Sequence, residues 1–206
     1  MIGLVKICGL TDRAAVEAAV EAGADALGFV FAESLRRVTP RQARALSGDL
    51  PDGLRRVAVM QHPSAEEWRA VLEEFTPQVL QTDAADLETL AVPEAIECWP
   101  VLREGGALPA TLPATFVYEG RRSGRGEAVD WGRAAGLGER GRMILAGGLD
   151  AGNVARAIRV ARPWGVDVSS AVESAPGVKD PALIAEFIRA ARSAGQVEDA
   201  TERYRS

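Results

Sequence analysis

Histidine and cysteine are scarce in this chain: its 206 residues include one histidine and two cysteines. Two cysteines do not make the disulfide framework of a small secreted domain, although a single Cys8–Cys98 disulfide is conceivable. The lone histidine, His62, follows the third expected strand and offers no cluster of ligands. We therefore expect no metal site.

Long apolar runs and an excess of basic residues are also absent. No apolar run approaches the roughly 18 residues needed to cross a bilayer, and the opening MIGLVKICGL lacks the layout of a signal peptide. The formal net charge is −5, whereas nucleic-acid binders usually present a basic face. We expect a cytoplasmic protein with no membrane or nucleic-acid partner. The acidic charge balance still permits a local basic pocket for an anionic small molecule.

Eight short apolar runs are the main pattern that the sequence does contain. Hydrophobic residues make up 47% of the chain, enough to bury a core and to exclude global disorder. Each run has the length of a strand, and several are rich in Val and Ile. The runs are residues 4–8, 26–31, 55–60, 78–81, 98–102, 115–118, 143–146 and 165–169.

Helical patterns separate most of these runs. Thr39 before Pro40 has the form of an N-cap followed by proline at the first helical position. Ser64, with Glu67 three residues later, has the spacing of a capping box. The expected helices are residues 12–22, 40–46, a segment that begins at 64, 152–161 and 181–194.

Repeated strand–helix units predict an α/β fold with a parallel sheet. Eight units fit a single (β/α)8 TIM barrel, a closed eight-stranded parallel sheet with outer helices. A doubly wound open sheet is the structural alternative, but no GxGxxG follows the first run, so its dinucleotide-binding version lacks support. The helix of the fifth unit is expected to be short or absent, because residues 104–112 hold two glycines and a proline. We expect a barrel domain over residues 1–195 and a polar, frayed tail over 196–206.

In such a barrel the functional residues lie at the C-terminal ends of the strands and in the loops that follow. Alternation along the first strand places Lys6 and Cys8 on one face, and Ile7 suits the helix-facing side, so Lys6 and Cys8 should point into the barrel. A buried lysine is costly unless it meets an anion. A cysteine near a cation can have a lowered pKa and serve as a base. The alternative is that Cys8 is only a small buried hydrophobic residue.

Two later loops carry charged residues that have both functional and ordinary explanations. Arg36 and Arg37 follow the second strand and could form a fork for a carboxylate, or belong to a solvated loop. Asp130 precedes a short helical segment, where aspartate is a common N-cap. Residues 121–127, with Ser123 among several glycines, look like a mobile loop that could close over a ligand.

The seventh and eighth strands end in loops suited to phosphate. Gly147 and Gly148 follow the seventh strand, and Ser169 and Ser170 follow the eighth. Glycines let a backbone approach a phosphate closely, and amides at helix starts point their donors at it. A phosphate site in these two loops recurs in this architecture. A single Gly-Gly pair is more often an ordinary turn, but the two loops together indicate a phosphorylated small-molecule ligand.

Taken together, these residues resemble phosphoribosylanthranilate isomerase over about residues 5–191. The KICG opening, followed by GADALGFVF, is specific to that family, and the loop after the second strand has its Arg-x-Val-Ser/Thr-Pro pattern. The glycine-rich loop before Asp130 ends in Asp-Trp, as in the family. The matching segments are residues 6–9, 23–31, 36–40, 123–131, 146–153 and 167–179.

The resemblance implies an enzyme of tryptophan biosynthesis that performs an Amadori rearrangement, converting the aminoaldose N-(5-phosphoribosyl)anthranilate into an aminoketose. The reaction needs an acid that protonates the ring oxygen and a base that removes the C2 proton, and no cofactor. By the family pattern Asp130 is the acid and Cys8 is the base. An unperturbed thiol has a pKa near 8.5, roughly, so Cys8 would need a lowered pKa, for which Lys6 is the expected cause.

The resemblance also implies the residues that bind the substrate. Arg36 would hold the anthranilate carboxylate, and Asp167, which shares the inward side of its strand with Ser169, could pair with Lys6 or touch the anthranilate amine. The phosphate would be bound mainly through backbone amides, and we expect a monomer or a homodimer. The implied phosphate-binding residues are Gly147, Gly148, Ser169 and Ser170.

Three positions depart from the family pattern. Asp83 stands where the family usually has histidine at the end of the fourth strand, and could replace a polar contact but not an imidazole. Glu119 stands where the family often has aspartate at the end of the sixth strand. Ala171 replaces the usual glycine after the Ser-Ser pair, where the loop approaches phosphate. None of the three changes Cys8 or Asp130.

Two rival interpretations share the fold. Another phosphosugar barrel, such as a ribulose-phosphate epimerase, a thiamine-phosphate synthase or a histidine-pathway isomerase, would have the same phosphate loops. The pair of Cys8 and Asp130 argues against these, and the epimerase needs a metal-binding His/Asp set that we do not find in the sequence. The rival of a different class is a barrel that binds a phosphorylated ligand without converting it, or a purely structural subunit.

Overall fold

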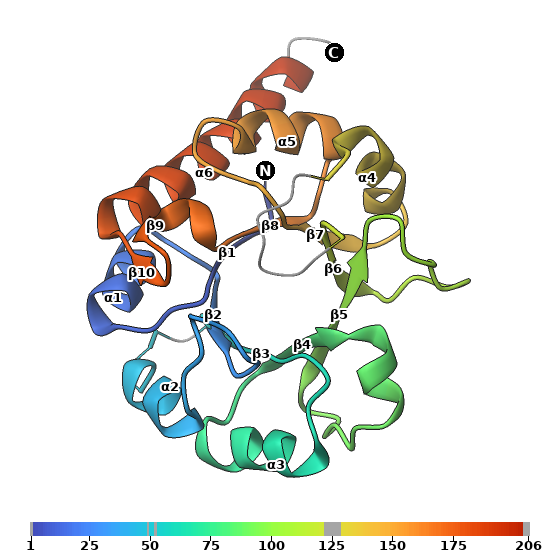
Figure 1. Cartoon of the computed structure of the whole chain (residues 1–206). Helices are drawn as coiled ribbons and strands as arrows, with labels where there is room; N and C mark the ends of the chain where they lie inside the picture. The colour runs from blue at the N-terminus through green and yellow to red at the C-terminus, as the bar shows by residue number, and fades with distance from the viewer. Residues whose placement is uncertain (1, 49, 52, 122–128, 204–206) are drawn as a thin grey trace.

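The computed structural model describes residues 2–48, 50–51, 53–121 and 129–203, with side chains described as far as residue 194. Eight parallel strands pair in sequence order, and β8 pairs with β1, which closes the barrel (Figure 1). The predicted barrel is therefore confirmed and the open sheet is wrong. The strands are β1 (Leu4–Cys8), β2 (Ala26–Val30), β3 (Arg55–Val59), β4 (Val79–Asp83), β5 (Glu97–Arg103), β6 (Thr115–Glu119), β7 (Arg142–Leu145) and β8 (Gly165–Val168).

Helices form the outer ring of the barrel, and their starts follow the expected capping chemistry. The predicted capping box at Ser64 is confirmed, since its hydroxyl accepts from the amide of Glu67 and the Glu67 carboxylate accepts from the amide of Ser64. Thr39 and Gln42 form a second box ahead of Pro40. The helices are α1 (Arg13–Glu21), α2 (Pro40–Leu46), α3 (Ala65–Glu74), α4 (Trp131–Gly138), α5 (Val154–Ala161) and α6 (Pro181–Arg203), with short 3-10 turns η1 (Ala84–Glu88) and η2 (Ser170–Val172).

Three segments depart from the repeated strand–helix unit. Residues 104–114, between β5 and β6, contain no helix, which confirms the weak fifth unit. A two-stranded hairpin that the sequence did not predict, β9 (Glu173–Ala175) with β10 (Val178–Lys179), follows η2. The last helix continues to Arg203, beyond the expected start of a frayed tail, because Gln, Glu, Ala and Arg all favour helix. The division into a 1–195 domain and a 196–206 tail stays a prediction.

The strands separate two apolar clusters, as alternation along a strand requires. Val5 and Ile7 of β1 belong to the larger cluster between the sheet and the helices. Leu4 belongs to a smaller cluster in the barrel interior, with Trp99 and Ile144. Lys6 and Cys8 share the inward side of Leu4, so the predicted orientation of these two residues is confirmed.

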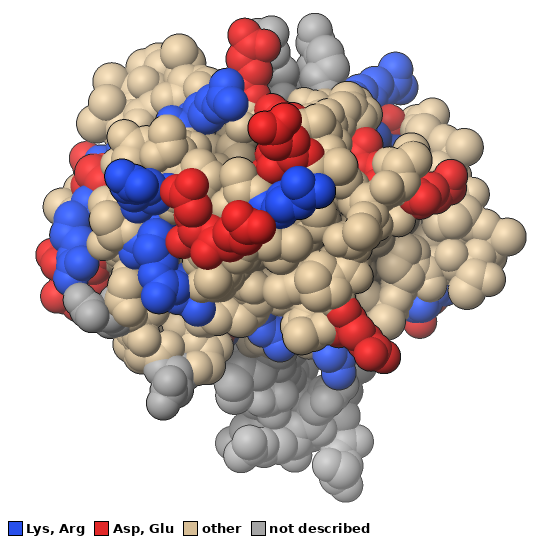
Figure 2. All heavy atoms as spheres, turned by 90° about the horizontal axis from the view of Figure 1, so that it is seen from below, with Lys and Arg blue, Asp and Glu red and all other residues tan. Residues whose placement is uncertain are grey.

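Charged side chains of both signs are interspersed on the face of the molecule that Figure 2 shows. The absence of a nucleic-acid partner stays a prediction. Within the part of the chain that the structure describes, none of the helices combines the length and apolar character that a membrane crossing requires.

Candidate active site

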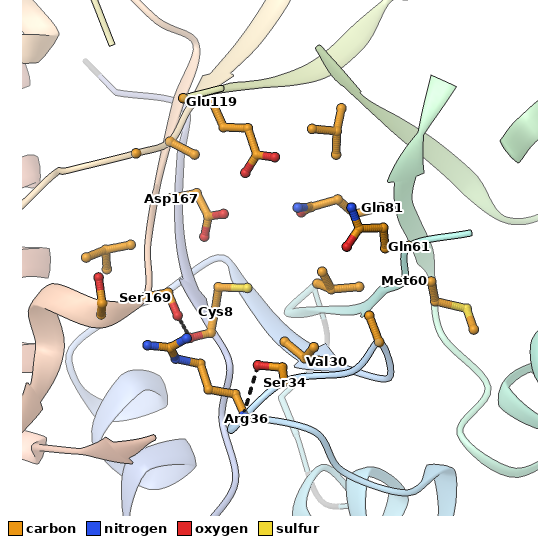
Figure 3. Close-up of a pocket in the computed structure, with 18 of the residues that line it drawn as sticks. Cys8, Val30, Ser34, Arg36, Met60, Gln61, Gln81, Glu119, Asp167 and Ser169 are labelled. Atoms are coloured by element: carbon orange, nitrogen blue, oxygen red, sulfur yellow. Dashed lines mark hydrogen bonds between the residues drawn. The ribbon is translucent and has the colours of Figure 1, made fainter. Parts of the chain in front are cut away.

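A pocket of about 180 Å³ opens at the C-terminal ends of the barrel strands (Figure 3). Its wall brings together residues from the ends of all eight strands or from the loops that follow them, as the barrel rule predicts. Eight of the ten catalytic and substrate-binding residues expected from the sequence lie in this wall. These are Cys8, Arg36, Asp83, Gly147, Gly148, Asp167, Ser169 and Ser170.

Lys6 and Asp167 form a buried ion pair beneath the pocket. They face each other across the β1–β8 seam, and Lys6 Nζ lies 2.9 Å from Asp167 Oδ2, so the predicted pairing is confirmed. The Lys6 side chain is fully buried. Burial lowers the pKa of Lys6, but the negative charges of Asp167 and Cys8 outweigh it and the net shift is upward. Burial raises the pKa of Asp167 against the attraction of Lys6.

Cys8 ends β1 with its thiol pointing into the pocket. The neighbouring β2 position is Gly28, where an added Cβ would lie 3.0 Å from Cys8 Sγ and 3.1 Å from Lys6 Nζ. Glycine therefore leaves the space in which the thiol and the ammonium meet. Burial nonetheless raises the pKa of Cys8, because the desolvation of a thiolate outweighs the favourable charge of Lys6. The negative charge of Asp167 raises the pKa of Cys8 further. Lys6 therefore acts on the thiol in the expected direction, but the expected net lowering of the Cys8 pKa is wrong for the ligand-free protein.

The two expected phosphate loops lie side by side on the pocket wall. Gly147 and Gly148 follow β7 with φ of +91° and +66°, a conformation that favours glycine, and both line the pocket. The Gly148 carbonyl accepts from Asn153 Nδ2 at 2.8 Å, which holds the turn against the start of α5. Ser169 and Ser170 line the same pocket after β8. This arrangement offers backbone amides to an anion at one side of the pocket.

Arg36 reaches the pocket from the β2 loop, and its guanidinium is already held by an ion pair. It is bound by the buried carboxylate of Glu173 on β9, with Arg36 Nε 2.6 Å from Oε1 and Nη2 2.9 Å from Oε2. Lys179 on β10 binds the same carboxylate at 2.6 Å. Roles for Glu173 and Lys179 were missed from the sequence. Their position inside the segment 167–179 that matched the family was the available signal.

A second charged cluster lines the opposite side of the pocket. Arg103 Nη1 lies 2.5 Å from Asp83 Oδ1, and Arg103 Nε lies 3.3 Å from Glu119 Oε1. Asp83, Glu119 and Arg103 all line the pocket. Arg103 was not predicted as a site residue, because the fifth strand was expected to end at residue 102. Its place as the last residue of β5 was a usable signal, since strand ends carry function in barrels.

His62 lies at the outer edge of this cluster. Its Nδ1 is 2.9 Å from Asp86 Oδ1 and its Nε2 is 3.4 Å from Asp83 Oδ2. The hydrogen bond with Asp86 and that residue's charge raise the pKa of His62. The expectation that the lone histidine has no ligand neighbours is thus wrong, since one ligand atom from each of these three side chains lies within 4.8 Å of the others. Arg103 already pairs with Asp83, and Thr82 donates to Asp86, so the cluster is built as a hydrogen-bonded charge network.

Asp130 does not lie in the pocket wall that the described residues form. It is the exposed N-cap of α4, and its Oδ1 accepts from the amides of Gly132 at 2.9 Å and Arg133 at 3.1 Å. The ordinary N-cap explanation is therefore confirmed, and a catalytic role stays a prediction. The expected closing loop falls mostly on residues 122–128, which lie outside the described residues.

The family of the chain follows from comparison with known proteins. The family model described as N-(5'phosphoribosyl)anthranilate (PRA) isomerase matches residues 5–190. The chain belongs to the PRA isomerase family. Among PRA isomerases, that of Listeria monocytogenes is 37% identical over 92% of this chain and 98% of the relative. The enzyme of Pelobacter propionicus is 39% identical over 91% of this chain and 95% of the relative.

Solved structures of PRA isomerases share the architecture. The phosphoribosylanthranilate isomerase from Thermotoga maritima superposes with a TM-score of 0.80 at 31% identity, over 94% of this chain and 100% of the other. Another, solved in complex with reduced 1-(o-carboxyphenylamino)-1-deoxyribulose 5-phosphate, superposes with a TM-score of 0.77 at 31% identity, over 94% of this chain and 100% of the other. The fold of this chain is therefore that of the PRA isomerase barrels.

Proposed function

We propose that this PRA isomerase family member converts N-(5'-phosphoribosyl)anthranilate into 1-(o-carboxyphenylamino)-1-deoxyribulose 5-phosphate, a step of tryptophan biosynthesis. The observation that carries the proposal is the composition of one pocket. A strand-end thiol at Cys8, a guanidinium at Arg36 and two amide-rich loops after β7 and β8 all face the same space. This set matches a substrate that carries a carboxylate, a sugar and a phosphate.

The chemistry requires two proton transfers and no redox cofactor. An acid protonates the ring oxygen, the furanose ring opens to a Schiff base, and a base then removes the C2 proton to give an enolamine, which tautomerises to the ketone. Each proton-transfer group of this kind contributes about 10²–10⁴ in rate. Cys8 is the base in this proposal. Because burial raises its pKa, the thiolate is scarce at neutral pH in the free protein, and turnover should rise with pH.

The remaining residues hold the substrate or the base in place. Arg36 binds the anthranilate carboxylate, and Asp83 contributes a polar contact on the far side of the pocket. Lys6 keeps a positive charge beside the thiolate, and Asp167, which lines the pocket, contacts the anthranilate amine. The phosphate is bound by the amides of the two loops, which comprise Gly147, Gly148, Ser169 and Ser170.

The general acid has two candidates, one suggested by the family motif and one by its position in the pocket. Asp130 is the acid by resemblance to the family motif. Glu119 is favoured by position, since it ends β6 and lines the pocket itself. We retain Asp130 as the acid and make Glu119 the alternative. Matched amide variants, Asp130→Asn and Glu119→Gln, distinguish the two, because an amide cannot deliver the proton.

The decisive experiment is turnover of freshly made N-(5'-phosphoribosyl)anthranilate, followed by loss of anthranilate fluorescence. We expect robust turnover, a fall of about 10²–10⁴ in kcat for Cys8→Ser, and a comparable fall for Asp130→Asn. No turnover by the folded, phosphate-binding protein would refute the proposal. It would favour the rival phosphosugar barrels, or a barrel that binds its ligand without converting it.

Two further properties belong to this proposal. We propose that the chain works as a monomer or a homodimer; the Thermotoga maritima relative is described as dimeric, with monomers produced from it. We also propose a cytoplasmic location. Both cysteines, Cys8 and Cys98, are free thiols, the usual state in a reducing compartment. The conceivable Cys8–Cys98 disulfide is therefore wrong.

A further inference from the structure

A buried charge network lies behind the pocket wall on the β8 side. Glu173 Oε1 accepts from Arg36 Nε and from Lys179 Nζ, each at 2.6 Å. Its second oxygen accepts from Arg36 Nη2 at 2.9 Å and from the amide of Gly177 at 3.1 Å. The side chains of Glu173 and Lys179 are 4% and 0% exposed. Of these residues only Arg36 lines the pocket, so Glu173 and Lys179 act on a ligand through other groups.

The geometry of the Arg36–Glu173 pair leaves one side of the guanidinium for a ligand. A guanidinium can present two hydrogens to a carboxylate along each of two edges. Glu173 takes the edge formed by Nε and Nη2, so among the described residues the edge formed by Nη1 and the outer hydrogen of Nη2 is left for a second carboxylate. Figure 3 shows Arg36 beside Cys8 and Ser169 at the edge of the pocket.

The backbone beneath Arg36 gives its side chain room to pack closely. Gly9, with φ of +75°, lies under the side chain, and a Cβ there would be 2.5 Å from Arg36 Cδ and 3.1 Å from Ser169 Oγ. Lys179 Nζ also donates to the Ser169 carbonyl at 2.8 Å, and Ser169 Oγ donates to the Cys8 carbonyl at 3.0 Å. Glu173 therefore connects the arginine to the start of the β8 loop and to the strand end that carries the thiol.

The network keeps a net positive charge at this side of the pocket. Arg36 and Lys179 contribute two positive charges and Glu173 contributes one negative charge. Burial opposes ionisation of Glu173, but hydrogen bonds from Arg36, Lys179 and the Gly177 amide outweigh it and lower its pKa to about 2. The carboxylate is thus charged at every pH at which the protein would be assayed.

We propose that Glu173 is a positioning residue that orients the guanidinium of Arg36 for the carboxylate of the substrate. It does not contact the substrate. By holding one edge of the guanidinium it reduces the conformational freedom that Arg36 would otherwise lose when it binds. The inference rests on the proposed function only in naming the substrate carboxylate as the group recognised.

The test compares two ligands that differ in one group. The first is reduced 1-(o-carboxyphenylamino)-1-deoxyribulose 5-phosphate, and the second is the same molecule without its carboxyl group. For Glu173→Gln we expect the Kd of the carboxylated ligand to rise about tenfold, since a charge-assisted contact is disordered. The Kd of the ligand without the carboxyl group should change by less than about threefold. Glu173→Asp retains the charge on a shorter stem and should fall between the unmodified protein and Glu173→Gln.

A double-mutant cycle separates positioning from a general loss of structure. Arg36→Met removes the guanidinium, so adding Glu173→Gln to it should weaken the carboxylated ligand no further. The matched control is Glu17→Gln, which breaks the exposed Arg13–Glu17 pair at 2.8 Å on α1. This control should leave the affinity of both ligands unchanged.

Equal weakening of both ligands by Glu173→Gln would overturn the proposal, because it would mean that Glu173 only maintains the loop. Unchanged affinity for both would overturn it as well. If Glu173→Gln does not fold, Glu173→Asp alone and combined with Arg36→Met completes the same cycle. Binding does not need turnover, so a protein that discriminates the ligands without converting the aminoaldose would refute the proposed function and leave this inference standing.

Discussion

Buried or half-buried ion pairs line both sides of the pocket, but only one side keeps the residues of the family pattern. On the β8–β1–β2 side the pairs Lys6–Asp167 and Arg36–Glu173 lie within segments that match the family. On the β4–β6 side two departures, Asp83 and Glu119, contact the same residue, Arg103. The two departures therefore belong together, because one guanidinium pairs with both carboxylates.

The largest expected effect is on stability, because the ion pair on the first side is more deeply buried than the one on the second. Lys6→Met leaves Asp167 buried without its partner, and we expect the free energy of unfolding to fall by about 3–5 kcal/mol. Arg103→Met is the matched change on the other side, where the Arg103 side chain is 25% exposed. That change should cost less, about 1–2 kcal/mol, because the two carboxylates left behind line the open pocket and keep contact with water. Urea unfolding of both variants measures the difference, and similar losses would contradict the comparison.

A smaller effect tests how the first side is packed. Gly9→Ala combines a positive φ with a Cβ directed at Arg36, so we expect a loss of about 1–3 kcal/mol in stability and weaker binding of the carboxylated ligand. Gly23→Ala is the control, because Gly23 has φ of +88° and no atom within 4 Å of an added Cβ. It should lose stability from backbone strain alone. Equal ligand affinities in the two variants would show that Arg36 moves aside without consequence.

The acid dependence of stability reports on Glu173. The folded pKa of Glu173, about 2, is depressed from its ordinary value of 4.5, so its contribution is fully present above about pH 4.5 and is lost as the pH falls through 2. The stability difference between the unmodified protein and Glu173→Gln should therefore be constant near neutral pH and shrink below about pH 4.5. Urea unfolding at several pH values measures it. A difference that grows on acidification would have the wrong sign.

The smallest effect concerns His62 on the second side. Asp86 contributes more than Asp83 to the raised pKa of His62, so Asp86→Asn should lower that pKa more than Asp83→Asn does, as followed by NMR titration. Because the folded pKa of His62 is raised, its contribution to stability is present at acidic pH and is lost as the pH rises through the folded value. The reverse order of the two variants would mean that Asp83 is the stronger partner.

Much of the barrel could be predicted because its signals are local. Alternation along β1 placed Lys6 and Cys8 inside, and the capping box at Ser64 marked the start of α3. The hairpin of β9 and β10 was missed because strands of three and two residues are too short to show a period. The residues with the clearest motif, Cys8 and Arg36, were also those placed in the pocket.

The sequence could not predict properties that depend on how burial and charge act together in the folded protein. Whether Lys6 lowers the pKa of Cys8 depends on how much water the thiol loses, and in the fold burial outweighs the charge. The pairing of Arg103 with two carboxylates depends on the distance between the ends of three neighbouring strands. His62 gained its acidic neighbours in the same way, since Asp83 and Asp86 belong to the next strand and the turn after it.

The seam between β1 and β8 has a consequence for how the chain is made. Lys6 and Asp167 are 161 residues apart, so a ribosome that adds about 5–20 residues per second completes the second partner roughly 10–30 s after the first. Throughout that interval the nascent chain holds an unpaired strand edge and a lysine without its anion. The ion pair that supports the thiol can form only when nearly the whole barrel has been synthesised. A truncated chain that stops before β8 should therefore be prone to aggregation and hold no assembled pocket.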